Sequence, residues 1–153
     1  DFNGEVELIH RESSTFVASL ETIPVMVNDG YAKHAGEAFT VQAVKFSQID
    51  DGSIDVLSID TEGSEGFVLK HMVSRPRVIS LETHGGAYRN PYHREITQWM
   101  RENGYALWYK DSSDSVYLRE GTVELSARDR LRNRLTEWRL TLGGARKRLT
   151  NRW

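Results

Sequence analysis

The sequence predicts an α/β fold in which a mostly parallel sheet ends in an antiparallel hairpin. Apolar runs at 54–60 and 77–83 both end in acidic residues, and Val68, Leu69 and Met72 recur between them at helical spacing. Further along, strand-forming segments at 105–110 and 115–119 flank the turn-forming residues 111–114. Strands that alternate with helices and then close in a hairpin indicate this architecture.

The composition is that of a globular domain. The chain has 153 residues, of which 39% are hydrophobic and 27% charged, values typical of one soluble domain. No apolar run approaches the roughly 20 residues of a membrane span, and no signal-peptide pattern is found. The absence of cysteine excludes disulfides, thiolate metal sites and cysteine nucleophiles. We therefore expect a cytoplasmic protein.

Charge divides the chain into two parts. Residues 124–153 contain nine Arg/Lys and three Asp/Glu, so they carry +6 and the first 123 residues carry −8. We predict an acidic domain over 1–122 and a basic amphipathic helical tail over 123–153. Ser126 and Asp129 form a capping-box pattern, and glycines at 143–144 should break the helix. Its apolar stripe consists of Leu131, Leu135, Trp138 and Leu142.

The stripe of the tail has three interpretations. It packs on its own domain, it packs on a partner, or it docks on a membrane surface, as basic amphipathic helices do. Nucleic acid is disfavoured as a partner, because the rest of the chain is acidic and its field opposes binding.

The N-terminal third predicts two strands separated by a long loop. Residues 5–10 alternate as a strand does, and 39–46 form a second strand. The polar segment 11–37 between them predicts a loop, interrupted by a short strand at Val25–Val27.

The middle of the chain carries two helix boundaries. Arg75-Pro76 ends the helix that follows the central strand. Asn90 is placed as the N-cap of the next helix, with Pro91 at its first position. Tyr92 and His93, near this helix start, are interpreted as structural residues.

The sharpest chemical signal is the convergence of polar residues at two strand ends. If strands 54–60 and 77–83 are parallel neighbours, they lie about 4.8 Å apart, and their carboxyl ends share one sheet edge. Asp60, Glu62, Glu82 and His84 would then meet there. The alternatives are that these residues only build loops, or that they bind a divalent metal such as Mg, Mn or Zn.

His84 is the predicted general base. An imidazole titrates near pH 6.5, and nearby carboxylates at Asp60, Glu62 and Glu82 should raise its pKa and orient it. The alternative is a surface histidine hydrogen-bonded to a neighbouring carboxylate. Tyr88 and Arg89 either rim a substrate cleft or belong to a loop.

These segments resemble the FkbM family of S-adenosylmethionine-dependent methyltransferases over about residues 1–110. The resemblance lies in the strand at 54–59, the Asp-Thr-Glu-Gly-Ser-Glu motif at 60–65, Leu69, and the second strand at 78–84 ending in Glu-Thr-His. It implies a class I, Rossmann-like methyltransferase fold and O-methylation of a hydroxyl on a small molecule, a sugar or polyketide-like metabolite.

We predict catalytic roles for Asp60, Glu62 and His84, and cofactor contacts from Asp60 and Thr61. The predicted substrate contacts are those of Glu82, Tyr88 and Arg89.

One departure from the family pattern changes the expectation. The glycine-rich cofactor turn of class I methyltransferases is missing, since no Gly-x-Gly occurs in the chain. We therefore predict that the chain corresponds to the C-terminal part of the domain, lacks the cofactor-binding half and binds the cofactor poorly. It should associate with itself or with the missing N-terminal segment. The alternative function is a non-catalytic interaction module whose basic tail docks on a partner or membrane.

Overall fold

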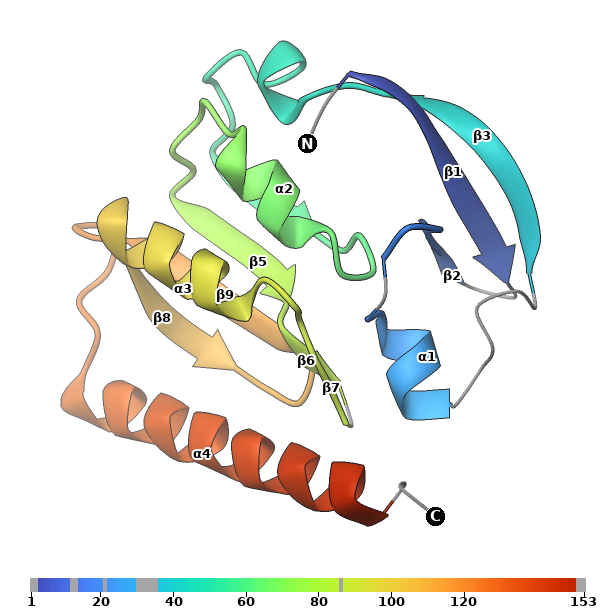
Figure 1. Ribbon diagram of the computed structural model, residues 1–153. Coiled ribbons are helices and arrows are strands. Elements are labelled where there is room, and N and C mark those ends of the chain that lie inside the picture. The colour runs from blue at the N-terminus through green and yellow to red at the C-terminus, as the bar shows by residue number, and fades with distance from the viewer. Residues whose placement is uncertain (1–2, 12–13, 21, 30–35, 86, 151–153) are drawn as a thin grey trace.

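The computed structural model describes residues 3–11, 14–20, 22–29, 36–85 and 87–150. Within them the chain forms a four-stranded sheet, a three-stranded sheet, a small two-stranded sheet and four α-helices (Figure 1). The predicted α/β class is confirmed in this coarse form.

The four-stranded sheet has the order β4-β5-β9-β8, and its strands are β4 (Val56–Ile59), β5 (Val78–Glu82), β9 (Asp114–Arg119) and β8 (Tyr105–Lys110). β4 and β5 pair in parallel, whereas β5–β9 and β9–β8 pair antiparallel. The predicted mostly parallel sheet is therefore not confirmed. The reason is that β5 takes its second neighbour from the closing hairpin, which runs in the opposite direction.

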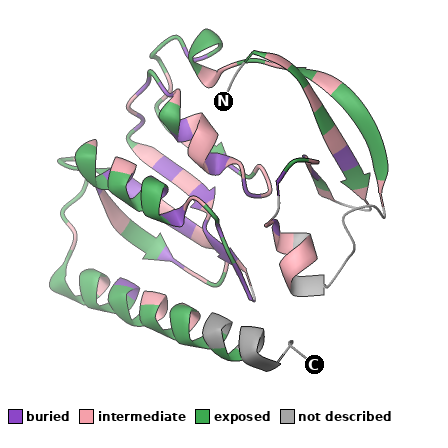
Figure 2. Ribbon diagram, viewed as in Figure 1, coloured by how far each residue is buried: buried purple, intermediate pink, exposed green. Residues whose placement is uncertain are grey.

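Two helices and the sheet enclose the main core. α2 (Glu65–Lys70) and α3 (His93–Glu102) lie against the sheet in Figure 1, and Figure 2 shows buried residues where they meet it. Leu69 from α2, Ile96 and Met100 from α3 and Ile79 from β5 are each at most 1% exposed. This apolar burial fixes the position of the loops at the ends of β4 and β5.

The N-terminal residues form a separate antiparallel sheet, β2-β1-β3, from β1 (Gly4–Arg11), β2 (Ser14–Val17) and β3 (Glu37–Ala43). The predicted strand at Val25–Val27 is wrong, because this segment lies in helix α1 (Pro24–Asp29). Proline favours the first position of a helix, and the backbone amide of Val27 donates to the carbonyl of Ile23 at 3.2 Å. The loop predicted over 11–37 thus contains β2 and α1.

The N-terminus of α3 differs from the prediction. The N-cap is Tyr92 and the helix begins at His93, so Asn90 is not the cap. Its side-chain oxygen accepts a hydrogen bond from the backbone amide of Tyr92 at 2.9 Å, and its amide nitrogen donates to Glu65. Asn90 therefore joins the start of α3 to the acidic loop.

The last helix, α4 (Ala127–Thr150), lies beside the hairpin (Figure 1). One half of its predicted capping box is present, since the amide of Asp129 donates to the Ser126 hydroxyl at 3.1 Å, whereas the Asp129 carboxylate accepts from that hydroxyl. The predicted break at the two glycines is wrong: the helix runs through 143–144, because each glycine costs only about 1 kcal/mol relative to alanine. Asn133 attaches the helix to β8 by donating to the carbonyls of Leu107 and Trp108.

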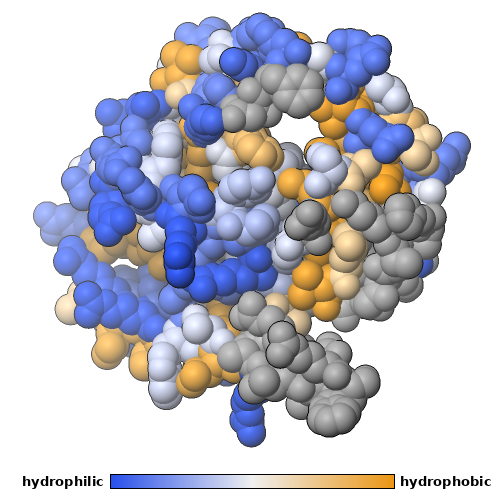
Figure 3. Space-filling model, in the orientation of Figure 1, coloured by the Kyte–Doolittle hydropathy of each residue, from blue (hydrophilic) through white to orange (hydrophobic). Residues whose placement is uncertain are grey.

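The apolar stripe of α4 is largely exposed. Leu131, Leu135 and Trp138 are 59%, 52% and 63% exposed, whereas Asn133 and Glu137 face the hairpin side. Figure 3 shows hydrophobic patches among hydrophilic surface in the lower part of the molecule, where α4 lies. Among the described helices, none is both long and apolar enough to cross a membrane.

Candidate functional site

The parallel pairing of β4 with β5 brings two acidic residues to one edge of the sheet. Ile59 pairs with Leu81 in the register, so Asp60, directly after β4, lies next to Glu82, the last residue of β5. The predicted adjacency of the two strands is confirmed. One carboxylate oxygen from each of Asp60, Glu65 and Glu82 lies within 4.8 Å of the others. We call these three residues the acidic cluster.

Glu65 holds the loop of the acidic cluster together. Its side chain is fully buried, and its Oε1 accepts hydrogen bonds from Thr61 N at 2.9 Å, Thr61 Oγ1 at 3.2 Å and Gly63 N at 3.3 Å. Its Oε2 accepts the amide of Asn90. The sequence contained Glu65 within the motif but gave it no role. A carboxylate in the first turn of a helix, able to reach back to free amides, was the available signal.

The backbone conformation of this loop favours a glycine at position 63. Gly63 has a φ of 105°, and Glu62 before it has a φ of 52°, a left-handed conformation that is uncommon for residues with a side chain. A Cβ at Gly63 would lie 3.3 Å from the Tyr88 hydroxyl oxygen. Glycine therefore allows Tyr88, which is 2% exposed, to pack against the loop.

Glu82 has an unusual protonation equilibrium. Burial, followed by the charges of Glu62 and Asp60, raises its pKa to about 8, because each of these disfavours a further negative charge. Burial also raises the pKa of Glu62, although a hydrogen bond from Ser14 acts in the opposite direction and lowers it. A carboxyl group with a pKa near neutrality can both accept and donate a proton under physiological conditions.

His84 does not join the acidic cluster, and the predicted shared site is wrong in this respect. β5 ends at Glu82, and His84 begins the short strand β6 (His84–Gly85), which pairs with β7 (Tyr88–Arg89). Its ring lies with Lys110, His93 and Glu137 instead. The predicted rise in its pKa is also wrong: burial, followed by the charge of Lys110, lowers the pKa of His84 to about 3.

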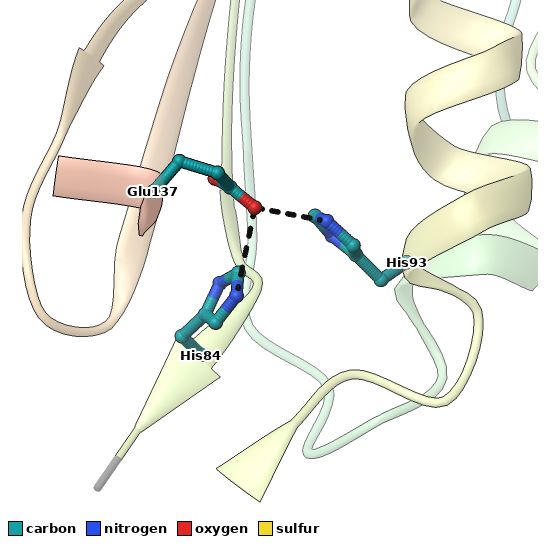
Figure 4. Close-up of side chains that lie close together, drawn as sticks. All are labelled: His84, His93 and Glu137. Atoms are coloured by element: carbon teal, nitrogen blue, oxygen red, sulfur yellow. Dashed lines mark ion pairs between the residues drawn. The ribbon is translucent and has the colours of Figure 1, made fainter. Parts of the chain in front are cut away.

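His84, His93 and Glu137 come together from three separate elements (Figure 4). Glu137 Oε1 lies 3.3 Å from His93 Nε2 and 3.9 Å from His84 Nε2. Lys110 Nζ lies 3.0 Å from the other oxygen, Glu137 Oε2. The bond to His93 and the charge of Lys110 outweigh burial and lower the pKa of Glu137 to about 2. We call His84, His93 and Glu137 the histidine cluster.

Sequence reasoning missed most of this second cluster. Its place at a helix start predicts a structural role for His93, and no local pattern marks Glu137 or Lys110. Glu137 belongs to a helix predicted to form a tail, and nothing in local spacing links it to His84. Only the packing of α4 against the hairpin brings the residues together.

The remaining predicted site residues occupy different environments. Thr61 uses both its amide and its hydroxyl to bind Glu65. Tyr88 is buried, whereas Arg89 is exposed. Their substrate contacts stay a prediction.

A cavity of about 810 Å³ lies between α3, the β8–β9 hairpin and α4. His93 and Glu137 contribute to its wall, together with apolar side chains that include Met100, Leu107 and Tyr117. One side of the histidine cluster therefore borders a space large enough for a small molecule.

Comparison with known families gives one result. The model of the methyltransferase FkbM domain matches residues 3–107, from β1 into β8, and so includes the acidic cluster, His84 and His93. Lys110 and Glu137 lie beyond the matched residues. No curated protein and no solved structure matches the chain.

Proposed function

The chain belongs to the FkbM methyltransferase family, and we propose that it acts in the methylation of a hydroxyl group on a sugar or polyketide-like metabolite. The observation that carries the proposal is Glu82, a carboxyl group with a pKa of about 8 beside Asp60 at the carboxyl ends of two parallel strands. Ligands of open α/β sheets bind at this edge.

Glu82 is the proposed general base. In methyl transfer, the hydroxyl oxygen would bond to the methyl carbon while the bond from that carbon to the donor's sulfur breaks, and the sulfur would leave with the electron pair. The hydroxyl must lose its proton in this step, and a carboxylate with a near-neutral pKa is well suited to accept that proton on Oε1 or Oε2. The neighbouring charges of Asp60 and Glu62 strengthen this basicity. His84 is a weaker base, because a pKa of about 3 gives little affinity for the proton.

Family membership implies S-adenosylmethionine as methyl donor, but the residues around Asp60 do not by themselves fit it. The amides of Thr61 and Gly63 and the Thr61 hydroxyl all bind Glu65, so they are not directed toward a ligand. The chain also has no Gly-x-Gly turn. The proposal for this chain is therefore limited to substrate activation by Glu82.

Deletion of the gene in its source organism tests the function. We expect the unmethylated substrate to accumulate, a hydroxylated metabolite that is lighter than the methylated product by one CH2, as mass spectrometry would detect. The wild-type gene and the exposed control Glu95→Gln should restore methylation, whereas Glu82→Gln should slow it roughly a hundredfold or more. An unchanged metabolite profile would exclude the function. Full restoration by Glu82→Gln would exclude only the assigned base.

The exposed stripe of α4 favours a second candidate function, docking on an anionic membrane surface. Leu131, Leu135 and Trp138 are exposed on a helix that also carries exposed arginines, the combination that binds lipid interfaces. Co-sedimentation with phosphatidylserine vesicles tests it: Leu135→Ser with Trp138→Ser should abolish binding. Equal sedimentation of wild type and variant would contradict this function.

A further inference from the structure

The histidine cluster contains the kinds of side chain that bind transition metals. Two imidazole nitrogens and one carboxylate oxygen, from β6, α3 and α4, lie within 4.8 Å of one another. Figure 4 shows both imidazole rings turned toward the Glu137 carboxylate. We propose that His84, His93 and Glu137 bind a first-row divalent metal ion such as Zn²⁺ or Co²⁺. This site is separate from the acidic cluster and does not depend on the proposed function.

Two of the three distances between the ligand atoms agree with a shared ion. Zinc bonds to nitrogen and oxygen of about 2.0–2.2 Å require two ligand atoms to lie within about 4 Å of each other. Glu137 Oε1 meets this condition with His93 Nε2 at 3.3 Å and with His84 Nε2 at 3.9 Å. Two imidazoles and one carboxylate form a donor set that suits Zn, Fe and Co and leaves further coordination positions open.

A second observation points independently to a ligand. His84 is 4% exposed, and its Nε2 is buried without a hydrogen-bond partner among the described residues. The distance of 3.9 Å from His84 Nε2 to Glu137 Oε1 is too long for a hydrogen bond. A buried polar atom left without a partner is costly, and a metal ion between the two atoms would satisfy both.

The surrounding residues hold the ligands in place. His84 Nδ1 lies 3.0 Å from the Thr83 hydroxyl and 3.1 Å from Lys110 Nζ. Binding of a metal by Nε2 requires the tautomer in which Nδ1 carries the proton and donates to Thr83 Oγ1, the kind of contact that orients a metal-binding imidazole. Lys110 binds Glu137 Oε2 at 3.0 Å and so fixes the carboxylate with Oε1 between the two rings. The ammonium group also weakens the attraction for a cation, so we expect moderate affinity.

The cavity gives small molecules access to the proposed metal site. His93 and Glu137 line the 810 Å³ space beneath α4, from which water or an oxygen of a small molecule can reach the open coordination positions. Because Glu137 lies outside the matched residues 3–107, the site would unite the family domain with its C-terminal helix.

Titration of the metal-free chain with Co²⁺ tests the proposal, since nitrogen-ligated Co²⁺ has visible absorption bands that Zn²⁺ displaces. We expect saturable binding of one ion. His93→Gln and Glu137→Gln should each weaken binding about tenfold or more. The matched controls His10→Gln and Glu95→Gln, both at exposed positions, should bind as the wild type does.

Circular dichroism establishes that each variant is folded, and NMR of the wild-type chain gives a test that needs no variant. Bound Co²⁺ should shift the imidazole resonances of His84 and His93 strongly, and those of His10 and His71 little. Absence of binding, or equal binding by His93→Gln and Glu137→Gln, would overturn the proposal. Shifts confined to residues 60–65 would place the ion in the acidic cluster and overturn it as well.

Discussion

The carboxylate of Asp50 binds Ser74 twice, accepting hydrogen bonds from its backbone amide at 2.7 Å and from its hydroxyl. It also accepts the amide of Val73 at 2.7 Å and that of Gly52 at 3.0 Å. Asp50 is only 4% exposed. It therefore ties the segment before β4 to the connection between α2 and β5, and with it the two strands that carry Asp60 and Glu82.

Replacing Asp50 should destabilise the chain. Asp50→Ala leaves several buried donors without an acceptor, so the free energy of unfolding should fall by on the order of 3 kcal/mol. Urea denaturation measures the loss. Asp51→Ala is the control, since Asp51 is exposed and accepts hydrogen bonds from the neighbouring Ser53, and its effect should be much smaller. Equal losses for the two variants would contradict the structural role of Asp50.

The contribution of Asp50 should also depend on pH. Burial opposes ionisation, but the hydrogen bonds from Ser74, Gly52 and Val73 outweigh it and lower the pKa of Asp50 from 3.8 to about 2. A carboxyl group whose pKa is lower in the folded than in the unfolded state stabilises the folded protein at any pH above its unfolded-state pKa. This stabilisation is lost as the pH falls through the folded-state pKa. The stability difference between wild type and Asp50→Asn should therefore shrink from pH 5 toward pH 2. A difference that is constant over this range would refute the assignment.

Glu82 should have the opposite effect on stability. Its pKa is raised from 4.5 to about 8, so the folded state binds the proton more tightly than the unfolded state does. Stability should therefore fall as the pH rises between these values. Glu82→Gln should remove this slope, as denaturation at several pH values would detect, whereas Glu95→Gln should retain it. An unchanged slope in Glu82→Gln would mean that another group titrates.

Binding of S-adenosylmethionine should be negligible for this 153-residue chain. The loop amides of Thr61 and Gly63 are occupied by Glu65, and no glycine-rich turn is available to contact the cofactor. Calorimetric titration measures this directly. Tight one-to-one binding would show that residues other than those predicted form a cofactor site.

The outer edge of β4 should promote association. Within the described residues β4 pairs only with β5, and Val56 is 68% exposed. An unpaired strand edge is a template for another strand, so we expect oligomers in sedimentation experiments at micromolar concentration. Val56→Lys should reduce association, because a charged side chain disfavours edge-to-edge pairing. A stable wild-type monomer would contradict the prediction.

The sequence by itself determined the local elements that have a strong periodic or capping signal. The strands around Asp60 and Glu82, the β8–β9 hairpin and the hydrogen bond from the Asp129 amide to Ser126 all follow from apolar patterning and turn chemistry within short segments. The parallel pairing of β4 with β5 also follows, because a strand–helix–strand unit leaves few alternatives. These features were sufficient to predict the acidic edge.

Only the tertiary structure decided which polar side chains meet. His84 was predicted to join Asp60, but its ring is buried beside Lys110, and burial reverses the direction of its pKa shift. Glu137 meets His84 and His93 because Asn133, on the same helix, binds two carbonyls of β8. Contacts between residues so distant along the chain depend on how helices pack on the sheet. Local periodicity contains no information about that packing.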